Sequence, residues 1–339
     1  MIRIGILGAA RIAPKAIVHP ASVRGDVKIQ AVAARDYARA EAFADKYSDR
    51  GAKIEALASY QAVVDHPDID LIYNPLPINL HAEWTIKALE AGKHVVCEKP
   101  FAMNIVEAEA MVAAAKANGK RVIEAFHYRY HEAFDYLMFS IHEEKDLGKI
   151  KSIKATFNVA IPDNNGKEIR HLPETGGGAF MDLGCYPVSW ALAIMEEEPK
   201  KVEATATLTK RGVDESMTAR LTFKNGAVAE LSSTMAPGEP FAASLFVEGK
   251  KGSAEFDNPL APHMGAKLAV KTGKDTFDHD IDPTATYWYQ LTDVINSLKT
   301  GMPALETEGE AILPQQRTLD RIYEAAGLRH LRYYEPDKT

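Results

Sequence analysis

The chain begins with I-R-I-G-I-L-G-A-A-R-I-A, residues 2–13, and this stretch decides the fold that the sequence predicts. An apolar run at residues 4–7 predicts a buried strand, and the amphipathic residues 11–23 predict a helix directly after it. The turn between them approximates the G-x-G-x-x-A pattern of a dinucleotide-binding turn, where helix N–H groups receive a pyrophosphate. Alanine replaces the middle glycine of the pattern, and its methyl group narrows the approach of the backbone to the pyrophosphate. We expect dinucleotide contacts from Gly8, Ala9, Ala10, Arg11 and Ile12.

Length and composition predict a globular protein with two domains. The 339 residues are enough for two domains of ordinary size, and 46% hydrophobic with 26% charged residues is typical of globular chains. The chain has a net charge of −7, whereas a protein that binds nucleic acid usually carries an excess of positive charge. The sequence presents no signal peptide or long apolar run, and its 2 cysteines form no C-x-x-C pair. We therefore expect a cytoplasmic protein that binds neither nucleic acid nor a membrane.

Strands alternate with helices in the first part of the chain. Apolar runs at residues 28–34, 71–74, 94–97 and 121–125 predict strands, and helical patterns separate them. This alternation is typical of a parallel, doubly wound sheet, so we assign residues 1–126 to a Rossmann domain of the α/β class. Ligands of such sheets bind beyond the carboxyl ends of the strands. Those ends here carry Gly8, Arg35, Pro75 and Lys99.

The end of the second strand predicts which dinucleotide is bound. An acidic residue at this place accepts a hydrogen bond from a ribose 2′-hydroxyl, whereas an arginine pairs with a 2′-phosphate. Arg35 comes first, so we expect NADP to be preferred, with NAD as a possible cofactor. Asp36 is interpreted as the N-cap of the next helix. Arg39 either adds positive charge to the phosphate site or is simply solvated.

The pattern changes after residue 126. Longer alternating runs between residues 150 and 247 predict a large, mostly antiparallel open sheet. A glycine run and an apolar helix over residues 180–194 interrupt it. We assign residues 127–339 to an α+β domain that binds substrate. One face of its sheet would be left open, so we expect a homodimer or homotetramer formed through this sheet.

Four motifs resemble those of the Gfo/Idh/MocA oxidoreductases. They are A-G-K-H-V-V-C-E-K-P at residues 91–100, N-P-L-P-I-N-L-H at 74–81, E-A-F-H-Y-R-Y at 124–130 and G-G-G-A-F-M-D-L-G-C-Y at 176–186. Together they extend the resemblance along nearly the whole chain. Tyr186 stands where many relatives have histidine. A tyrosine at this position makes the chain most similar to the branch of dihydrodiol dehydrogenases, glucose–fructose oxidoreductases and NADP-dependent D-xylose dehydrogenases. It departs from the family pattern at Ala10, Ile78 and Glu132.

The resemblance implies a catalytic site. Lys99, Asp182 and Tyr186 would be catalytic. The same three residues and Arg170 would contact the substrate. A free tyrosine has a pKa near 10, so a neighbouring lysine would have to stabilise the phenolate for Tyr186 to act as a base. The residues alone also allow Asp182 as a helix cap and Tyr186 as a core aromatic.

The resemblance also implies further cofactor contacts and a peptide bond before Pro100 that is often cis. The expected cofactor contacts beyond the first turn are Arg35, Arg39, Pro75, Leu76, Pro77, His81, Glu98, Lys99 and Arg129. Arg129 and Arg170 could equally be structural ion-pair partners. The histidines do not have the spacing of metal ligands on one face, so we predict no metal.

Three functions are open at this point. The first is an NADP-preferring enzyme that transfers a hydride between the nicotinamide and a secondary alcohol of a small polyhydroxylated substrate, a sugar or cyclic diol. The second is a non-catalytic NAD(P)-binding regulator on the same fold. The third is a sugar–sugar oxidoreductase with a tightly held cofactor. The trio Lys99, Asp182 and Tyr186 favours an enzyme, because a regulator has no need of it.

Overall fold

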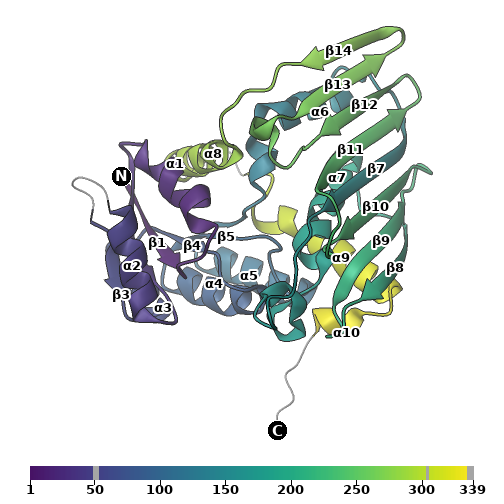
Figure 1. The fold of residues 1–339 in the computed structure, drawn as a ribbon. Coiled ribbons are helices and arrows are strands. Elements are labelled where there is room, and N and C mark those ends of the chain that lie inside the picture. The colour runs from purple at the N-terminus through teal and green to yellow at the C-terminus, as the bar shows by residue number, and fades with distance from the viewer. Residues whose placement is uncertain (49–52, 303–304, 334–339) are drawn as a thin grey trace. The chain divides into compact units, whose positions relative to one another are not determined.

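The computed structural model describes residues 1–48, 53–302 and 305–333. Contacts within the chain divide it into two units (Figure 1). The first contains residues 1–127 and Tyr287–Leu313, and the second contains the residues between them and those from Pro314 onward. The sequence-based domains, 1–126 and 127–339, did not include this return of Tyr287–Leu313 to the first unit.

The first unit is built on a six-stranded sheet in the order β3-β2-β1-β4-β5-β6, with every pairing parallel. Both the predicted strand pattern and the doubly wound order of a Rossmann fold are therefore present. The sequence reading overlooked β3, because its three residues are too short to show a period. The strands are β1 (Ile2–Leu7), β2 (Val27–Ala33), β3 (Glu55–Leu57), β4 (Leu71–Asn74), β5 (His94–Cys97) and β6 (Val122–Glu124).

Apolar side chains fill both faces of this parallel sheet, as expected when helices cover it on both sides. One core cluster joins β1, β2 and β4 to α1 (His19–Ser22), α2 (Tyr37–Tyr47) and α8 (Thr286–Thr300). The opposite cluster includes residues of α3 (Tyr60–Val64), α4 (His81–Glu90) and α5 (Ile105–Ala117).

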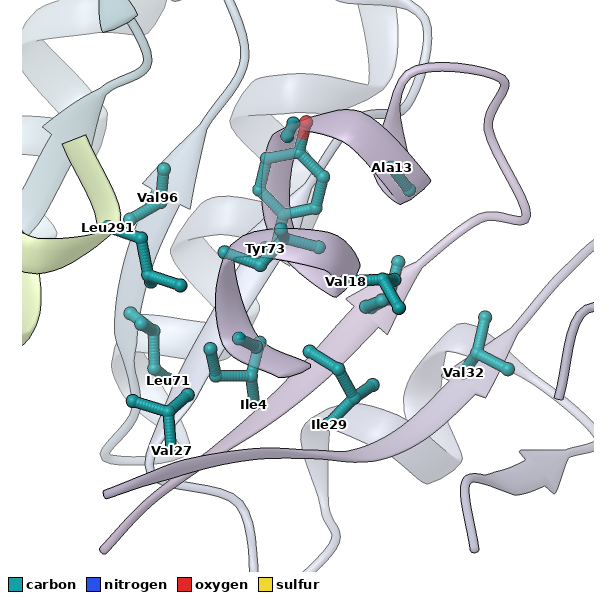
Figure 2. Close-up of a cluster of buried hydrophobic side chains, with 14 of the residues drawn as sticks. Ile4, Ala13, Val18, Val27, Ile29, Val32, Leu71, Tyr73, Val96 and Leu291 are labelled. Atoms are coloured by element: carbon teal, nitrogen blue, oxygen red, sulfur yellow. The ribbon is translucent and has the colours of Figure 1, made fainter. Parts of the chain in front are cut away.

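Helix α8 belongs to the first unit because one of its faces is apolar. Leu291, Val294 and Ile295 follow helical spacing and are at most 2% exposed. Figure 2 shows Leu291 beside Val96 and Leu71, so this late segment completes a core begun near the N-terminus.

The second unit is built on an eight-stranded sheet in the order β14-β13-β12-β11-β7-β10-β9-β8. Only the β7–β10 pairing is parallel, which agrees with the predicted mostly antiparallel sheet. The sequence reading overlooked the last three strands. The strands are β7 (Ile150–Asn158), β8 (Lys201–Leu208), β9 (Asp214–Thr222), β10 (Val228–Thr234), β11 (Ala242–Gly249), β12 (Gly252–Asp257), β13 (Lys267–Thr272) and β14 (Asp275–His279).

The two faces of this sheet differ in character. Helices α6 (Glu132–His142) and α7 (Cys185–Met195) contact the sheet, and α9 (Leu313–Ala325) and α10 (Arg329–Arg332) follow late in the chain (Figure 1). The outward residues are largely polar. Thr156 and Ser232 form a hydrogen bond of 2.9 Å there, and Arg220 pairs with Glu230.

One stretch of the described chain, Pro173–Met195, is long and apolar enough to cross a membrane by length and composition, with a mean hydropathy of 1.2. This differs from the expectation that the sequence contains no long apolar run. Within the structure 78% of that window is buried, as in a core helix that is apolar on all sides.

Candidate functional site

The turn after β1 has the geometry of a dinucleotide-binding turn. Gly8 adopts a φ of 96°, and its N–H donates to Ala33 O at 2.7 Å. A Cβ atom at this position would lie 3.2 Å from Leu76 Cδ2, so glycine allows the turn to approach the segment Pro75–Pro77. Ala13 is fully buried, which explains the small residue there. The helix that follows begins at Pro14 and has no side-chain cap. These features fit a pyrophosphate at the helix start.

Positive charge gathers beside this turn. Arg35 and Arg39 are exposed, and Arg39 Nη2 donates to Ala9 O at 3.4 Å. Burial raises the pKa of Tyr60, and the nearby charges of Arg35 and Arg39 oppose that rise. Asp36 Oδ1 accepts from Ala38 N at 3.0 Å, so its interpretation as an N-cap is confirmed. The carboxylate is engaged by the helix, and the two guanidinium groups suit a 2′-phosphate.

His81 joins the two segments at the carboxyl ends of β4 and β5. Its side chain is buried, Nε2 lies 2.7 Å from Leu76 O, and Nδ1 lies 3.1 Å from Pro100 O. Burial lowers its pKa to about 4, although these carbonyl oxygens favour the protonated form. Both ring nitrogens therefore face backbone oxygens, and the ring connects Pro75–Pro77 with Glu98-Lys99-Pro100.

The Glu98-Lys99-Pro100 segment is tightly held within the first unit. Tyr73 donates to Glu98 Oε1 at 2.6 Å, and burial raises the pKa of Tyr73 well above its usual value. Lys99 is half-buried, and the Lys99–Pro100 peptide bond is cis, as the resemblance implied. Phe101 N donates to the buried carboxylate of Glu124 at 2.9 Å. These contacts fix the backbone on each side of Lys99.

In the second unit, Asp182 and Tyr186 lie on one continuous helical segment. It starts as a π-helical turn, Phe180–Gly184, and continues as α7. Residues four apart are neighbours on a helix surface, so the expected shared face is compatible with this segment. A π-helical turn within a helix often occurs at a functional site. Gly184 permits the tight turn, since a Cβ there would lie 2.3 Å from the ring of Phe180.

Arg170 pairs with Asp182 through an Nε–Oδ2 distance of 2.6 Å and with Glu168 through an Nη1–Oε1 distance of 2.8 Å. The carboxylates raise the pKa of Arg170, which keeps it charged. An ion-pair role is one of the two alternatives that the sequence leaves open for Arg170, and the structure supplies the partners. The structure therefore brings two predicted site residues together and adds Glu168, which the sequence did not indicate.

Tyr186 is 4% exposed and lies among aromatic rings of its own unit. Its ring centroid is 5.4 Å from that of Phe157 in an edge-to-face arrangement and 6.0 Å from that of Tyr128. Tyr128 donates to Ser189 Oγ at 2.7 Å, and burial raises its pKa. The surrounding rings hold the Tyr186 ring in place, so the ring is partly a core aromatic. Arg129 is half-buried, with its guanidinium 5.4 Å from the ring of Phe134.

Among the described residues, no group of three or more histidine, cysteine, aspartate or glutamate side chains is arranged to hold a metal ion.

Comparison with known proteins gives matches along the chain. Residues 2–126 match the oxidoreductase family with an NAD-binding Rossmann fold, and residues 138–255 match the GFO/IDH/MocA C-terminal domain. D-xylose 1-dehydrogenase (NADP(+)) 2 of Haloferax volcanii is 33% identical, covering 95% of this chain and 96% of that protein. Trans-1,2-dihydrobenzene-1,2-diol dehydrogenase of Xenopus tropicalis is 32% identical, covering 82% of each.

Among solved structures, KijD10, a 3-ketoreductase from Actinomadura kijaniata in complex with NADP and TDP-benzene, is similar with a TM-score of 0.85. It is 25% identical and the match covers 96% of this chain and 97% of that one. The turn at Gly8, the parallel six-stranded sheet and the second, mostly antiparallel sheet agree with these matches. The chain therefore belongs to the Gfo/Idh/MocA family of NAD(P)-binding oxidoreductases.

Proposed function

We propose that the protein catalyses reversible hydride transfer between NADP and a secondary alcohol of a sugar or cyclic diol. The observation that carries this proposal is the Arg170–Asp182 ion pair on the helical segment that also bears Tyr186. The side chain of Asp182 is only 17% exposed and pairs with the Arg170 guanidinium, so its carboxylate is held in place to orient a substrate hydroxyl. The NADP-dependent relatives support the choice of cofactor.

A bound nicotinamide dinucleotide would supply the hydride acceptor or donor, the chemistry that no side chain provides. Its pyrophosphate would be held by Gly8, Ala9, Ala10, Arg11 and Ile12, and its 2′-phosphate by Arg35 and Arg39. Pro75, Leu76, Pro77, Glu98, Lys99 and Arg129 would complete the contacts. His81 would act indirectly, because its two ring nitrogens already face Leu76 O and Pro100 O.

In the oxidative direction, Tyr186 Oη would accept the proton of the substrate hydroxyl. The Lys99 ammonium would stabilise the phenolate. Asp182, held in position by Arg170, would accept a hydrogen bond from a second substrate hydroxyl. The rings of Tyr128 and Phe157 restrict the motion of Tyr186, so little orientation is lost during proton transfer. In the reverse direction Tyr186 would return the proton to the carbonyl oxygen.

The experiment that tests this function is absorbance at 340 nm with NADP and NAD against aldoses, deoxysugars, inositols and cyclic diols. Tyr186→Phe should lower kcat by about 100-fold or more, because it removes the proton acceptor. Tyr136→Phe, a tyrosine on α6, is the control and should leave kcat near that of the wild type. Near-normal turnover of Tyr186→Phe would remove Tyr186 from proton transfer.

The absorbance assay and gel filtration of the cofactor complex separate the other two functions. NADP binding without reduction by any alcohol, and without oxidation of NADPH by any ketone, would favour the regulator. Cofactor that stays bound during gel filtration would favour the sugar–sugar oxidoreductase.

A cytoplasmic location and a homodimer or homotetramer through the polar face of the second sheet complete the proposal. Cys97 and Cys185 are both buried and form no disulfide bond, which suits a reducing compartment.

A further inference from the structure

The second unit contains a buried carboxyl group that the proposed reaction does not use. Asp214, the first residue of β9, is fully buried. Its Oδ2 accepts from Phe180 N at 2.6 Å, and its Oδ1 accepts from the hydroxyl of Tyr323 at 2.8 Å. Tyr323 lies on α9 and is also fully buried. The carboxyl group thus connects β9 and α9 to the first residue of the π-helical turn.

The glycine run before this turn leaves room for the contact. Gly178 has a φ of 134°, and a Cβ there would lie 2.2 Å from Asp214 Oδ1 and 2.9 Å from Tyr323 Oη. Its N–H donates to Arg170 O at 2.9 Å. The same short segment therefore lies against Asp214 on one side and against the backbone of Arg170 on the other. Any side chain at position 178 would displace one of these neighbours.

Two further contacts hold the same helical segment. Arg332 is fully buried and donates through Nη1 to the sulfur of Met181 at 2.6 Å. Gln315 Nε2 donates to Cys185 O at 2.7 Å. Both partners come from the C-terminal helices, so the helical segment is held on each side of Asp182, at Phe180 and Met181 before it and at Cys185 after it.

We propose that Asp214 and Tyr323 are positioning residues that hold the start of the helical segment so that Asp182 and Tyr186 meet the substrate correctly. This inference rests on the proposed function of Asp182 and Tyr186. The physical reason is the small tolerance of proton and hydride transfer to displacement, since about 1 Å can cost about 100-fold in rate. A direct catalytic role for Asp214 conflicts with its full burial and with hydrogen bonds at both oxygens.

The hydrogen-bond pattern predicts which substitutions preserve the arrangement. In Asp214→Asn, the amide oxygen can accept from Phe180 N, and the amide N–H₂ can donate to Tyr323 Oη, which reverses that hydrogen bond but keeps a polar partner for each neighbour. Asp214→Ala removes both and leaves a buried N–H and a buried hydroxyl without this acceptor. Tyr323→Phe removes one contact only. Thr218→Ala, at an exposed position on the same strand, is the matched control.

The test combines hydrogen exchange of the full-length protein with steady-state kinetics and NADP binding. Asp214→Ala should speed amide exchange in residues 179–186 by about tenfold or more and lower kcat by about tenfold or more. The Kd for NADP should stay within about twofold, since the proposed dinucleotide-binding turn lies in the first unit. Asp214→Asn should remain within about threefold of wild type in every measurement, and Thr218→Ala should match wild type.

Unchanged exchange in residues 179–186 of Asp214→Ala would overturn the anchoring, whether or not a substrate is known. Faster exchange with unchanged kcat would also overturn the proposal, because Asp214 would then support only the fold. If Asp214→Ala does not fold, Tyr323→Phe decides, and wild-type exchange and kcat in that variant would refute the inference. A wild-type protein that oxidises no alcohol would refute the proposed function separately.

Discussion

The buried carboxyl group of Asp214 should make the stability of the second unit depend on pH. Burial raises its pKa to about 7, from an ordinary value of 3.8. Between these values the folded protein holds a proton that the unfolded chain has released. The stabilising contribution of that proton is complete below pH 3.8 and is lost as the pH rises through about 7. At about 1.4 kcal/mol per pH unit, the unfolding free energy should fall by about 4 kcal/mol across this window.

Asp214→Asn isolates this contribution, because the neutral amide resembles the protonated acid and does not titrate. The unfolding free energy of the variant relative to wild type should increase by about 2 kcal/mol between pH 5 and pH 7, because the group is half ionised at the upper limit. Urea unfolding followed by tryptophan fluorescence measures it. Trp84→Phe and Trp288→Phe in the common background leave Trp190, fully buried in the second unit, as the reporter.

Asp278→Asn, a substitution at an exposed position of β14, controls for the loss of one negative charge. A difference between Asp214→Asn and wild type that stays constant from pH 5 to pH 7 would refute the reasoning. It would mean that the carboxyl group is ionised throughout this range and that its two hydrogen bonds offset its burial.

Three further predictions concern the cofactor and the assembly. Arg35→Ala should raise the Kd for NADP by about tenfold or more and the Kd for NAD by less than about threefold. Lys46→Ala is the control, and equal losses of affinity for the two dinucleotides would show that Arg35 does not select between them. Gly8→Ala should weaken the binding of both dinucleotides about equally in a titration, because the new side chain strains a backbone φ of 96° and contacts Leu76. Gly119→Ala is the control: it strains a backbone φ of 60°, but no neighbouring atom lies near its Cβ, so it should not weaken binding. If the polar face of the second sheet joins two copies, Glu230→Arg should lower the mass measured by light scattering, and an unchanged mass would place the interface elsewhere.

Local features of the fold were predictable from the sequence because neighbouring residues encode them. The apolar run and small residues of 2–13 predicted β1 and its turn. The run at 71–74 predicted β4 with its observed bounds, and Asp36 caps α2 by accepting from Ala38 N, as the sequence predicted. The alternation of strands and helices predicted a parallel sheet, whereas the strand order β3-β2-β1-β4-β5-β6 comes from the structure.

Contacts between distant residues were decided only by the tertiary structure. Leu291 returns to the first unit because its helix face fits a core left open by β1 and β4. No periodic pattern in the sequence indicates the partners of Arg170, the three carbonyl groups around His81 or the burial of Asp214. The sequence by itself determined the family, the doubly wound sheet and the residue types of the site. Packing decided how these side chains are paired and held, because a hydrogen bond depends on the positions of atoms that lie far apart along the chain.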